Sequence, residues 1–558
     1  MLWKLFFLST LFSAALTALA LPDPPPQVQI GNTTVVGASL PLFNEEFFGG
    51  IPFAEPPVGT LRFARPKPKF TLDAPSFTAT DFGLPCLQPG FDLTNSSEDC
   101  LTINVYRPAG VQPNASLAVM AWIYGGGFLT GYTSIFNASV LVEQSIIRGT
   151  PIIYVSMNYR VGPLGWPQGD EAASHGLLNL GLRDQLLALQ WVQANIAAFG
   201  GDPKKVTVFG ESAGAVSAAL HYLNDYFPTV ARAAIFESGL AATIPLFRAS
   251  RGLPSWLDFA GNVSSCATDP TFSPHNTLPC LLKASSSDIL FGINAGRAVE
   301  EFGFPPVLDG LGGLISDLAS PRLLSGAGGH VPLLAGTNLD EGTAFAPTGI
   351  STQSALSSYF ASNYTPSPLG PFALDAAIAG IFALYPDIPS LGSPYGTGNN
   401  TFGLPAEFKH AASIGADLSF HSQRRLWARI LSQRGTKFYG YLFTDPSEDN
   451  PEVGVTHGLE LLYVYGVVAL TTGPPATLSL QMMDYWISFA TSLDPNDGKG
   501  TPRPTWDLYG ENQRGRIDVP RPSQSIIQLN ATNTTMIPDT YRAAGIEFMI
   551  ENRLVFSN

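Results

Sequence analysis

One serine of the chain lies in a pattern that favours nucleophilic chemistry. Ser212 is the centre of Gly-Glu-Ser-Ala-Gly at 210–214, with strand-like residues at 206–209 before it and small helix-forming residues after it. A sharp turn from strand to helix at such a motif holds the hydroxyl out of the sheet. Both flanking glycines are needed, because a side chain at either position would collide with neighbouring backbone. The motif alone is a weak signal, since it also occurs in ordinary glycine-rich turns.

An activated serine needs a base, and histidine usually provides it. Six of the seven histidines follow Ser212 in the chain. His221, His410 and His421 lie in segments with a helical pattern, which are poor positions for reaching across a site. His457 lies in a loop at 454–458 that follows a predicted strand at 437–443. Because catalytic loops form at the carboxyl ends of strands, His457 is the best candidate base.

Two neighbouring acids qualify as the partner of the histidine. Asp340 and Glu341 come directly after a predicted strand at 331–336. Spacing alone does not decide which of the two is the partner of the histidine. The simpler alternative is that both are solvated loop charges, and we expect that state for one of the two.

A glycine run offers backbone donors for a developing oxyanion. The glycines at 125–127 follow a predicted buried strand at 118–124. Without Cβ atoms, their N–H groups could point at a ligand oxygen together with the N–H of Ala213. The alternative is a flexible glycine loop, which is less expected at the end of a core strand.

Alternating strands and helices predict the scaffold that carries these residues. Strands are expected at 101–106, 118–124, 152–158, 206–209 and 233–236, and a helix with a broad apolar face at 182–199. This alternation predicts a mainly parallel sheet flanked by helices.

Other stretches predict additions to this scaffold. Helices at 374–385 and 406–432 could form a cap, and 49–63 is proline-rich and therefore expected to be a packed loop. Since nothing marks a clean domain break, we predict one catalytic domain over 21–558 with large insertions.

The N-terminus and the charge balance indicate the compartment. Lys4, an apolar run at 5–16 and Ala-Leu-Ala at 18–20 predict a signal peptide over 1–20. A membrane anchor is the alternative, but the apolar run is short and prolines follow it at once. The net charge of −14 disfavours nucleic acid and anionic membranes as partners. We therefore expect a secreted, extracellular protein without a transmembrane anchor.

Cysteines and glycosylation sequons fit secretion. The four cysteines are Cys86, Cys100, Cys266 and Cys280, which allow three pairings. Asn-x-Ser/Thr sequons, each weak evidence alone, occur at Asn32, Asn95, Asn114, Asn137, Asn262, Asn363, Asn399, Asn530 and Asn533.

Taken together, these motifs resemble those of the type-B carboxylesterase/lipase family, which includes cholinesterases and Candida rugosa-type fungal lipases. The similarity runs from Gly-Ile-Pro at 50–52 to the His457 loop. It includes Ser-Glu-Asp-Cys-Leu at 97–101, Asn-Tyr-Arg-Val-Gly at 158–162, Leu-Arg-Asp-Gln at 182–185, Phe-Gly-Gly-Asp-Pro at 199–203 and Gly-Glu-Ser-Ala-Gly at 210–214. The resemblance implies an α/β-hydrolase fold, with a large mostly parallel central sheet, flanking helices and helical cap insertions. It also implies a serine-dependent carboxylic ester hydrolase. No cofactor and no metal is implied.

The resemblance also implies roles for individual residues. It identifies Ser212 as nucleophile, His457 as base and Glu341, rather than Asp340, as the acid. The oxyanion donors become Gly126, Gly127 and Ala213. The implied disulfides are Cys86–Cys100 and Cys266–Cys280, the implied ion pairs are Arg62–Glu98 and Arg160–Asp184, and Glu211 and Ser238 are assigned supporting roles.

The substrate is less well defined by the sequence. The 86–100 loop contains no tryptophan, which disfavours choline esters. It is also shorter than the lid of the fungal lipases, which favours an esterase for apolar or aromatic esters. We expect Phe128, Leu129, Phe304 and Phe345 to line the acyl pocket.

Several alternatives stay open. They are a triacylglycerol lipase or sterol esterase that contacts an oil interface, a feruloyl esterase, and a catalytically silent adhesion protein. The intact set of Ser212, Glu341 and His457 argues against the last of these. The expected partners are otherwise a small-molecule or lipid ester and water.

Overall fold

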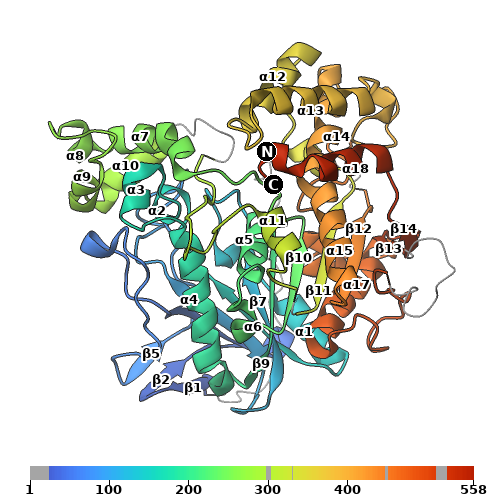
Figure 1. The fold of residues 1–558 in the computed structure, drawn as a ribbon. Coiled ribbons are helices and arrows are strands. Elements are labelled where there is room, and N and C mark those ends of the chain that lie inside the picture. Colours follow the sequence, from blue (N-terminus) through green and yellow to red (C-terminus); the bar gives the residue numbers. More distant parts are fainter. Residues whose placement is uncertain (1–23, 297–302, 330, 447–449, 511–523) are drawn as a thin grey trace.

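The computed structural model describes residues 24–296, 303–329, 331–446, 450–510 and 524–558. The predicted signal peptide lies outside these residues. At the centre is an eleven-stranded sheet in the order β14-β13-β12-β11-β10-β9-β7-β8-β6-β4-β3 (Figure 1). The run from β13 to β8 is parallel, and the pairs beyond it at both edges are antiparallel. The predicted mainly parallel sheet is therefore confirmed.

The strands of this sheet are β3 Ala38–Leu40, β4 Glu45–Pro52, β6 Thr102–Pro108, β7 Leu117–Ile123, β8 Ile152–Met157, β9 Gly201–Glu211, β10 Ala233–Glu237, β11 Leu333–Asn338, β12 Phe438–Phe443, β13 Ser525–Leu529 and β14 Thr535–Pro538. A small separate sheet contains β1 Gln27–Ile30, β2 Thr33–Val36 and β5 Ser76–Thr78.

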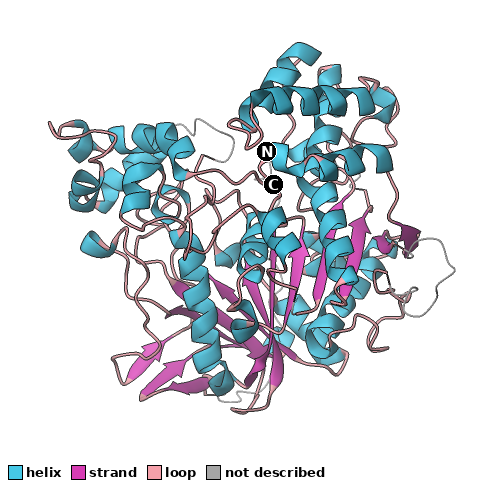
Figure 2. Ribbon diagram, in the orientation of Figure 1, coloured by secondary structure: helices cyan, strands magenta, loops and turns pink. Residues whose placement is uncertain are grey.

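Helices cover both faces of the large sheet (Figure 2). The central strands β8, β10, β11 and β12 are buried along their whole length, as expected for parallel strands with helices on either side. The covering helices include α1 Ser139–Ile147, α4 Leu180–Asn195, α5 Ala213–Tyr222, α15 Ser422–Gln433 and α17 Pro474–Ser492. Shorter helices are α2 Gly162–Gly165, α3 Gly169–Ser174, α6 Phe227–Val230, α11 Ala319–Ser325 and α16 Leu461–Val464.

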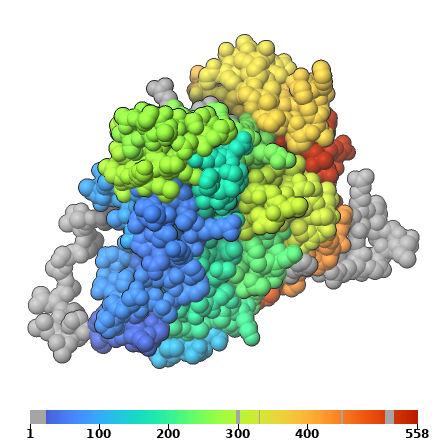
Figure 3. Space-filling model, turned by 60° about the vertical axis from the view of Figure 1, so that its left-hand side comes forward, coloured from blue at the N-terminus to red at the C-terminus, as the bar shows by residue number. Residues whose placement is uncertain are grey.

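Two helical insertions form lobes above the end of the sheet where α5 begins (Figures 1 and 3). One contains α7 Leu253–Gly261, α8 Ser264–Ala267, α9 Leu278–Lys283 and α10 Ser286–Ala295. The other contains α12 Gln353–Asn363, α13 Pro371–Leu384 and α14 Ala406–Ala416, and it packs with α18 Ala543–Glu551 around a second apolar core. Helices α14 and α15 are joined by a π-helical turn at Asp417–His421.

One predicted loop is partly a strand. The prolines at 49–63 predicted irregular structure, yet residues 49–52 belong to β4, which pairs with β6. Pro52 ends the strand, where a missing N–H is tolerated. The pairing of β4 with β6 shifts in register between Phe48 and Ile51, at a bulge where Gly50 has φ 65°.

Two disulfides close short loops, and two buried ion pairs join segments further apart in the chain. Disulfides connect Cys86 to Cys100 and Cys266 to Cys280. The two implied ion pairs are confirmed. Arg62 donates to Glu98 at 2.6 and 2.8 Å, and Arg160 donates to Asp184 at 2.8 and 2.7 Å. Arg160 Nη1 also donates to the Arg62 carbonyl at 3.0 Å, so the two pairs form one network.

Breaking the first pair is expected to destabilise the fold. In Arg62→Met the Glu98 carboxylate stays buried without its counter-charge, and we expect a loss of about 3–5 kcal/mol of unfolding free energy in urea denaturation. Arg429→Met is the matched control, because Arg429 and Glu547 are 25% and 43% exposed. An exposed pair contributes about 0–1 kcal/mol. Equal losses in the two variants would contradict the assignment of the Arg62 pair as structural.

Candidate active site

Ser212 lies at the turn between β9 and α5. Its backbone adopts φ 55° and ψ −127°, a conformation rarely taken by non-glycine residues. It is partly exposed, whereas Gly210, Glu211 and the whole of α5 are buried. The turn thus presents one hydroxyl at the edge of the core.

Close backbone packing fixes this turn. A Cβ added to Gly214 would lie 2.0 Å from the Ile123 carbonyl oxygen, and one added to Gly210 would lie 2.6 Å from the same atom. The Ser212 N–H donates to the Glu237 carbonyl at 3.0 Å. The glycines are therefore required by contact with β7, as the sequence predicted.

His457 and Glu341 are in direct contact. Nδ1 of His457 lies 2.6 Å from Oε2 of Glu341, whose other oxygen accepts the Asn338 N–H at 2.7 Å. Glu341 is fully buried, and the His457 side chain is 10% exposed. The rings of Phe345 and Phe420 pack against the imidazole at 4.9 and 5.1 Å between centroids. The second nitrogen, Nε2, lies 3.2 Å from Glu211 Oε1.

Asp340, the acid that does not contact His457, is buried, whereas the sequence predicted an acid exposed to solvent. It is 1% exposed, so its description as a solvated loop charge is wrong. Its carboxylate accepts from Ser393 Oγ at 2.7 Å, the Tyr395 N–H at 2.9 Å and the Val455 N–H at 3.0 Å. Since Val455 lies two residues before His457, Asp340 anchors the histidine loop.

Three further polar residues of the site went unnoticed in the sequence. Asn338 donates its side-chain amide to the Thr456 carbonyl at 2.8 Å and to Glu460. The other oxygen of Glu460 accepts from Ser238 Oγ at 3.2 Å. Glu237 accepts from Trp486 Nε1 at 3.1 Å. The Glu460 spacing, three residues after His457, is the one signal that could have pointed to it.

This crowding of buried carboxylates perturbs protonation. Burial raises the pKa of Glu211 to about 7 and that of Glu460 to about 8. Burial also raises the pKa of Glu237 well above its usual range. Burial lowers the pKa of His457, but Glu211 and Glu341 outweigh it and raise this pKa to about 9. Carboxylates and imidazole therefore compete for protons at one site.

The glycine loop lies against Ser212. A Cβ on Gly125 would lie 2.9 Å from the Ser212 Cβ. Gly126 and Gly127 have φ 111° and 63°, and among the described residues their N–H groups donate no hydrogen bond. Ala213 is the first residue of α5, where an N–H has no acceptor within the helix. These three amides are thus available donors beside the serine.

A cavity of about 120 Å³ begins beside His457. Phe345 and Phe420, which contact the imidazole, are part of its wall, and Phe247, Tyr359 and Phe360 continue it. Among the four predicted pocket residues, only Phe345 lines this cavity. Phe128 packs on Trp166 and Phe304 on Phe259, so both belong to the core. Leu129 is likewise outside this wall.

The 86–100 loop is fastened to the first lobe. The Gly90 N–H donates to Asn294 Oδ1 at 2.9 Å, and Asn294 Nδ2 donates to the Phe91 carbonyl at 3.3 Å. Phe91 also packs edge-on against Tyr132 at 5.5 Å. These contacts tie the short loop to α10.

Sequon exposure varies. Asn32, Asn95, Asn114, Asn137, Asn399 and Asn533 are exposed, and Asn262, Asn363 and Asn530 are half-buried. The Asn530 amide nitrogen already donates to the Thr444 carbonyl at 2.9 Å. Glycans are therefore easiest to accommodate at the six exposed sites.

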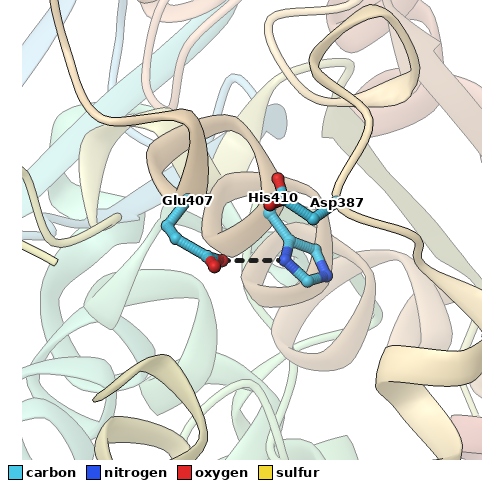
Figure 4. Close-up of side chains that lie close together, drawn as sticks. All are labelled: Asp387, Glu407 and His410. Atoms are coloured by element: carbon cyan, nitrogen blue, oxygen red, sulfur yellow. Dashed lines mark hydrogen bonds and ion pairs between the residues drawn. The ribbon is translucent and has the colours of Figure 1, made fainter. Parts of the chain in front are cut away.

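One group of described residues could share a metal ion. Atoms of Asp387, Glu407 and His410 lie within 4.8 Å of one another (Figure 4). His410 Nδ1 and Glu407 Oε2 are 3.0 Å apart, which is already a hydrogen bond. The group lines neither the turn at Ser212 nor the cavity beside His457.

Among the described residues, no helix is both long enough and apolar enough to cross a bilayer.

Comparison with known proteins identifies the family of the chain. A model of the carboxylesterase family matches residues 24–536. Lipase 2 of Geotrichum candidum is 34% identical, with 96% of this chain and 97% of the relative covered. Secreted lipase 1 of Botryotinia fuckeliana is 31% identical over 97% of this chain and 98% of its own. The crystal structure of Aspergillus niger EstA matches with a TM-score of 0.80 at 26% identity, over 96% of this chain and 100% of that one. The protein belongs to the carboxylesterase family and is a carboxylic ester hydrolase with the α/β-hydrolase fold.

Proposed function

We propose that this protein is a secreted serine esterase that hydrolyses apolar or aromatic esters through an acyl-enzyme on Ser212. The observation that carries this proposal is the His457–Glu341 hydrogen bond beside the strained Ser212 turn, because His457 Nε2 lies 3.2 Å from Glu211, the residue before Ser212. The structure gives no direct hydrogen bond between His457 and Ser212 among the described residues. The sequence-predicted signal peptide and the name of the Botryotinia relative support secretion.

The proposed reaction proceeds in two halves. His457 Nε2 takes the Ser212 proton while Oγ attacks the ester carbonyl, and the amides of Gly126, Gly127 and Ala213 bind the oxyanion. The imidazolium, stabilised by Glu341, then protonates the leaving alcohol. Water attacks the acyl-enzyme with His457 again as base, which releases the acid and restores Ser212.

Glu211 is expected to set the pH dependence of this reaction. Only neutral His457 can accept a proton, and the Glu211 charge 3.2 Å from Nε2 favours the imidazolium. In Glu211→Gln that charge is lost and the pKa of His457 falls. The acidic limb of the kcat/KM profile should therefore move to lower pH, by about one unit. Glu551→Gln, a change on the exposed end of α18, should leave the profile in place. If the acidic limb of the kcat/KM profile stays in place or moves to higher pH in Glu211→Gln, Glu211 does not set the pH dependence.

The cavity beside His457 supports esters of limited acyl size. Its wall is mostly aromatic and aliphatic, with Arg251, Asn363 and Ser419 among its polar members, and its volume is about 120 Å³. The 86–100 loop is short and bonded to Asn294, which favours an esterase over a lipase with a large lid. The Geotrichum and Botryotinia relatives carry the name lipase, which keeps a triacylglycerol lipase as the second candidate.

A chain-length series separates these candidates. We expect kcat/KM for p-nitrophenyl esters to peak at short or medium acyl chains and to drop at least tenfold at palmitate. A maximum at palmitate with activation above the solubility limit would indicate a lipase instead. Faster turnover of methyl ferulate would indicate a feruloyl esterase. A folded protein inactive on every ester would favour the adhesion-type alternative.

A further inference from the structure

A second cavity lies where the end of α13, helix α14 and the start of α18 meet. Its wall contains neither Ser212 nor His457. Its volume is about 490 Å³, which is in the range of small-molecule sites. It shares no wall residue with the cavity beside His457. Its lining includes the apolar residues Leu384, Leu391 and Ala544 and the polar residues Tyr395, His410 and Arg542.

The polar part of this lining contains a buried group that lacks a partner. The His410 side chain is 3% exposed, and its Nε2 has no hydrogen bond among the described residues. Figure 4 shows Glu407 on the opposite, Nδ1, edge of the ring. Tyr395 Oη, beside Ser413, also lacks a partner in hydrogen-bonding geometry. Leaving such a group unpaired costs about 1–3 kcal/mol, so a ligand that pairs with it gains affinity.

The charges around this cavity favour an uncharged ligand. Arg542 is neutralised by Asp417 through two bonds of 2.7 Å. Glu407 lies 3.0 Å from His410, and Asp387 is also nearby (Figure 4). An anion would therefore meet two carboxylates without a free cation, and a cation would meet Arg542. Either ion would lose hydration without a new counter-charge.

The hydrogen-bonding pattern narrows the ligand further. His410 Nδ1 faces Glu407, so Nε2 is the ring nitrogen left for a ligand. The Tyr395 hydroxyl can donate or accept. A hydroxyl group suits either partner, because it can donate or accept at Nε2 and at the Tyr395 hydroxyl. We propose that this second cavity binds an uncharged alcohol, with its apolar chain along Leu384, Leu391 and Ala544.

The wall of this cavity also reaches the catalytic loop. Tyr395 donates its backbone N–H to Asp340 at 2.9 Å, and Asp340 accepts from Val455 at 3.0 Å. Binding itself requires no catalysis, so this inference stands apart from the proposed reaction.

Isothermal titration with 1-octanol tests the site. We expect one saturable site in the wild type, with octanoate and octylamine at least tenfold weaker. Ala544 is exposed at the cavity edge, so Ala544→Trp should fill the space and weaken octanol at least tenfold. Tyr395→Phe should weaken it by about three- to tenfold, the value of one hydrogen bond.

Two matched variants separate this site from the cavity beside His457. Glu551→Trp adds the same ring elsewhere on α18 and should leave the affinity within twofold. Gly415→Leu narrows the first cavity, where a Cβ has no neighbour within 4 Å, and should also leave it unchanged. The proposal is overturned if Gly415→Leu abolishes binding while Ala544→Trp retains it, if octanoate binds as tightly as octanol, or if wild type binds no octanol.

Discussion

Replacement of Ser212 by alanine is expected to lower kcat by about 10⁴-fold or more. The change removes only the oxygen that would attack the ester, while the close backbone contacts of Gly210 and Gly214 still fix the turn. Initial rates on p-nitrophenyl butyrate give the measurement. Thermal melting should show that the variant folds like the wild type.

Ser217 offers the matched control for this change. It is buried in the same helix α5 and accepts from Gln185 Nε2 at 3.3 Å, so Ser217→Ala also removes a hydroxyl close to the site. We expect its kcat to stay within about tenfold, because one such hydrogen bond is worth about 0.5–1.5 kcal/mol. Activity of Ser212→Ala at the level of Ser217→Ala would mean that another residue is the nucleophile.

Glu341→Gln is expected to lower kcat by about 10³–10⁴-fold with little change in KM. A carboxylate in contact with His457 Nδ1 at 2.6 Å fixes the tautomer with Nε2 free to accept the serine proton. An amide in its place carries no charge to stabilise the imidazolium, and it can present an N–H to Nδ1 and so favour the wrong tautomer.

The neighbouring acid provides the comparison that decides between the two carboxylates. Asp340 holds Ser393, Tyr395 and Val455 and makes no contact with the imidazole in the structure. Asp340→Asn should therefore lower the melting temperature, while kcat of the folded enzyme stays within about tenfold, since the change leaves the catalytic groups in place. A larger loss of kcat in Asp340→Asn than in Glu341→Gln would reverse the assignment.

The sequence predicted those parts of the site that depend on local pattern. The glycines around Ser212 and the position of His457 after a strand are such features. The choice of Glu341 over Asp340 required the family resemblance, because adjacent residues on one loop are equivalent by spacing. The structure separates them, since a 3₁₀ turn at Glu341–Ala344 begins between the two and directs their side chains to different partners.

Features formed by distant segments could not be predicted in this way. The partners of Asp340 come from residues 393–395 and 455, and the Asn338–Glu460 contact spans 122 positions. The pocket residues show the same limit. Phe128 adopts φ 64° and its ring packs on Trp166. No sequence pattern predicts this orientation of the side chain. Phe345 faces the cavity because its ring packs on His457 and Phe420.

The most direct test of the account is to trap the acyl-enzyme. The protein is mixed with excess p-nitrophenyl butyrate, quenched in acid within the first turnovers, digested and analysed by peptide mass spectrometry. We expect one butyryl group per chain, on Ser212, and none in Ser212→Ala. A butyryl group on another residue, or hydrolysis by wild type with no acylated peptide under any quench time, would contradict it.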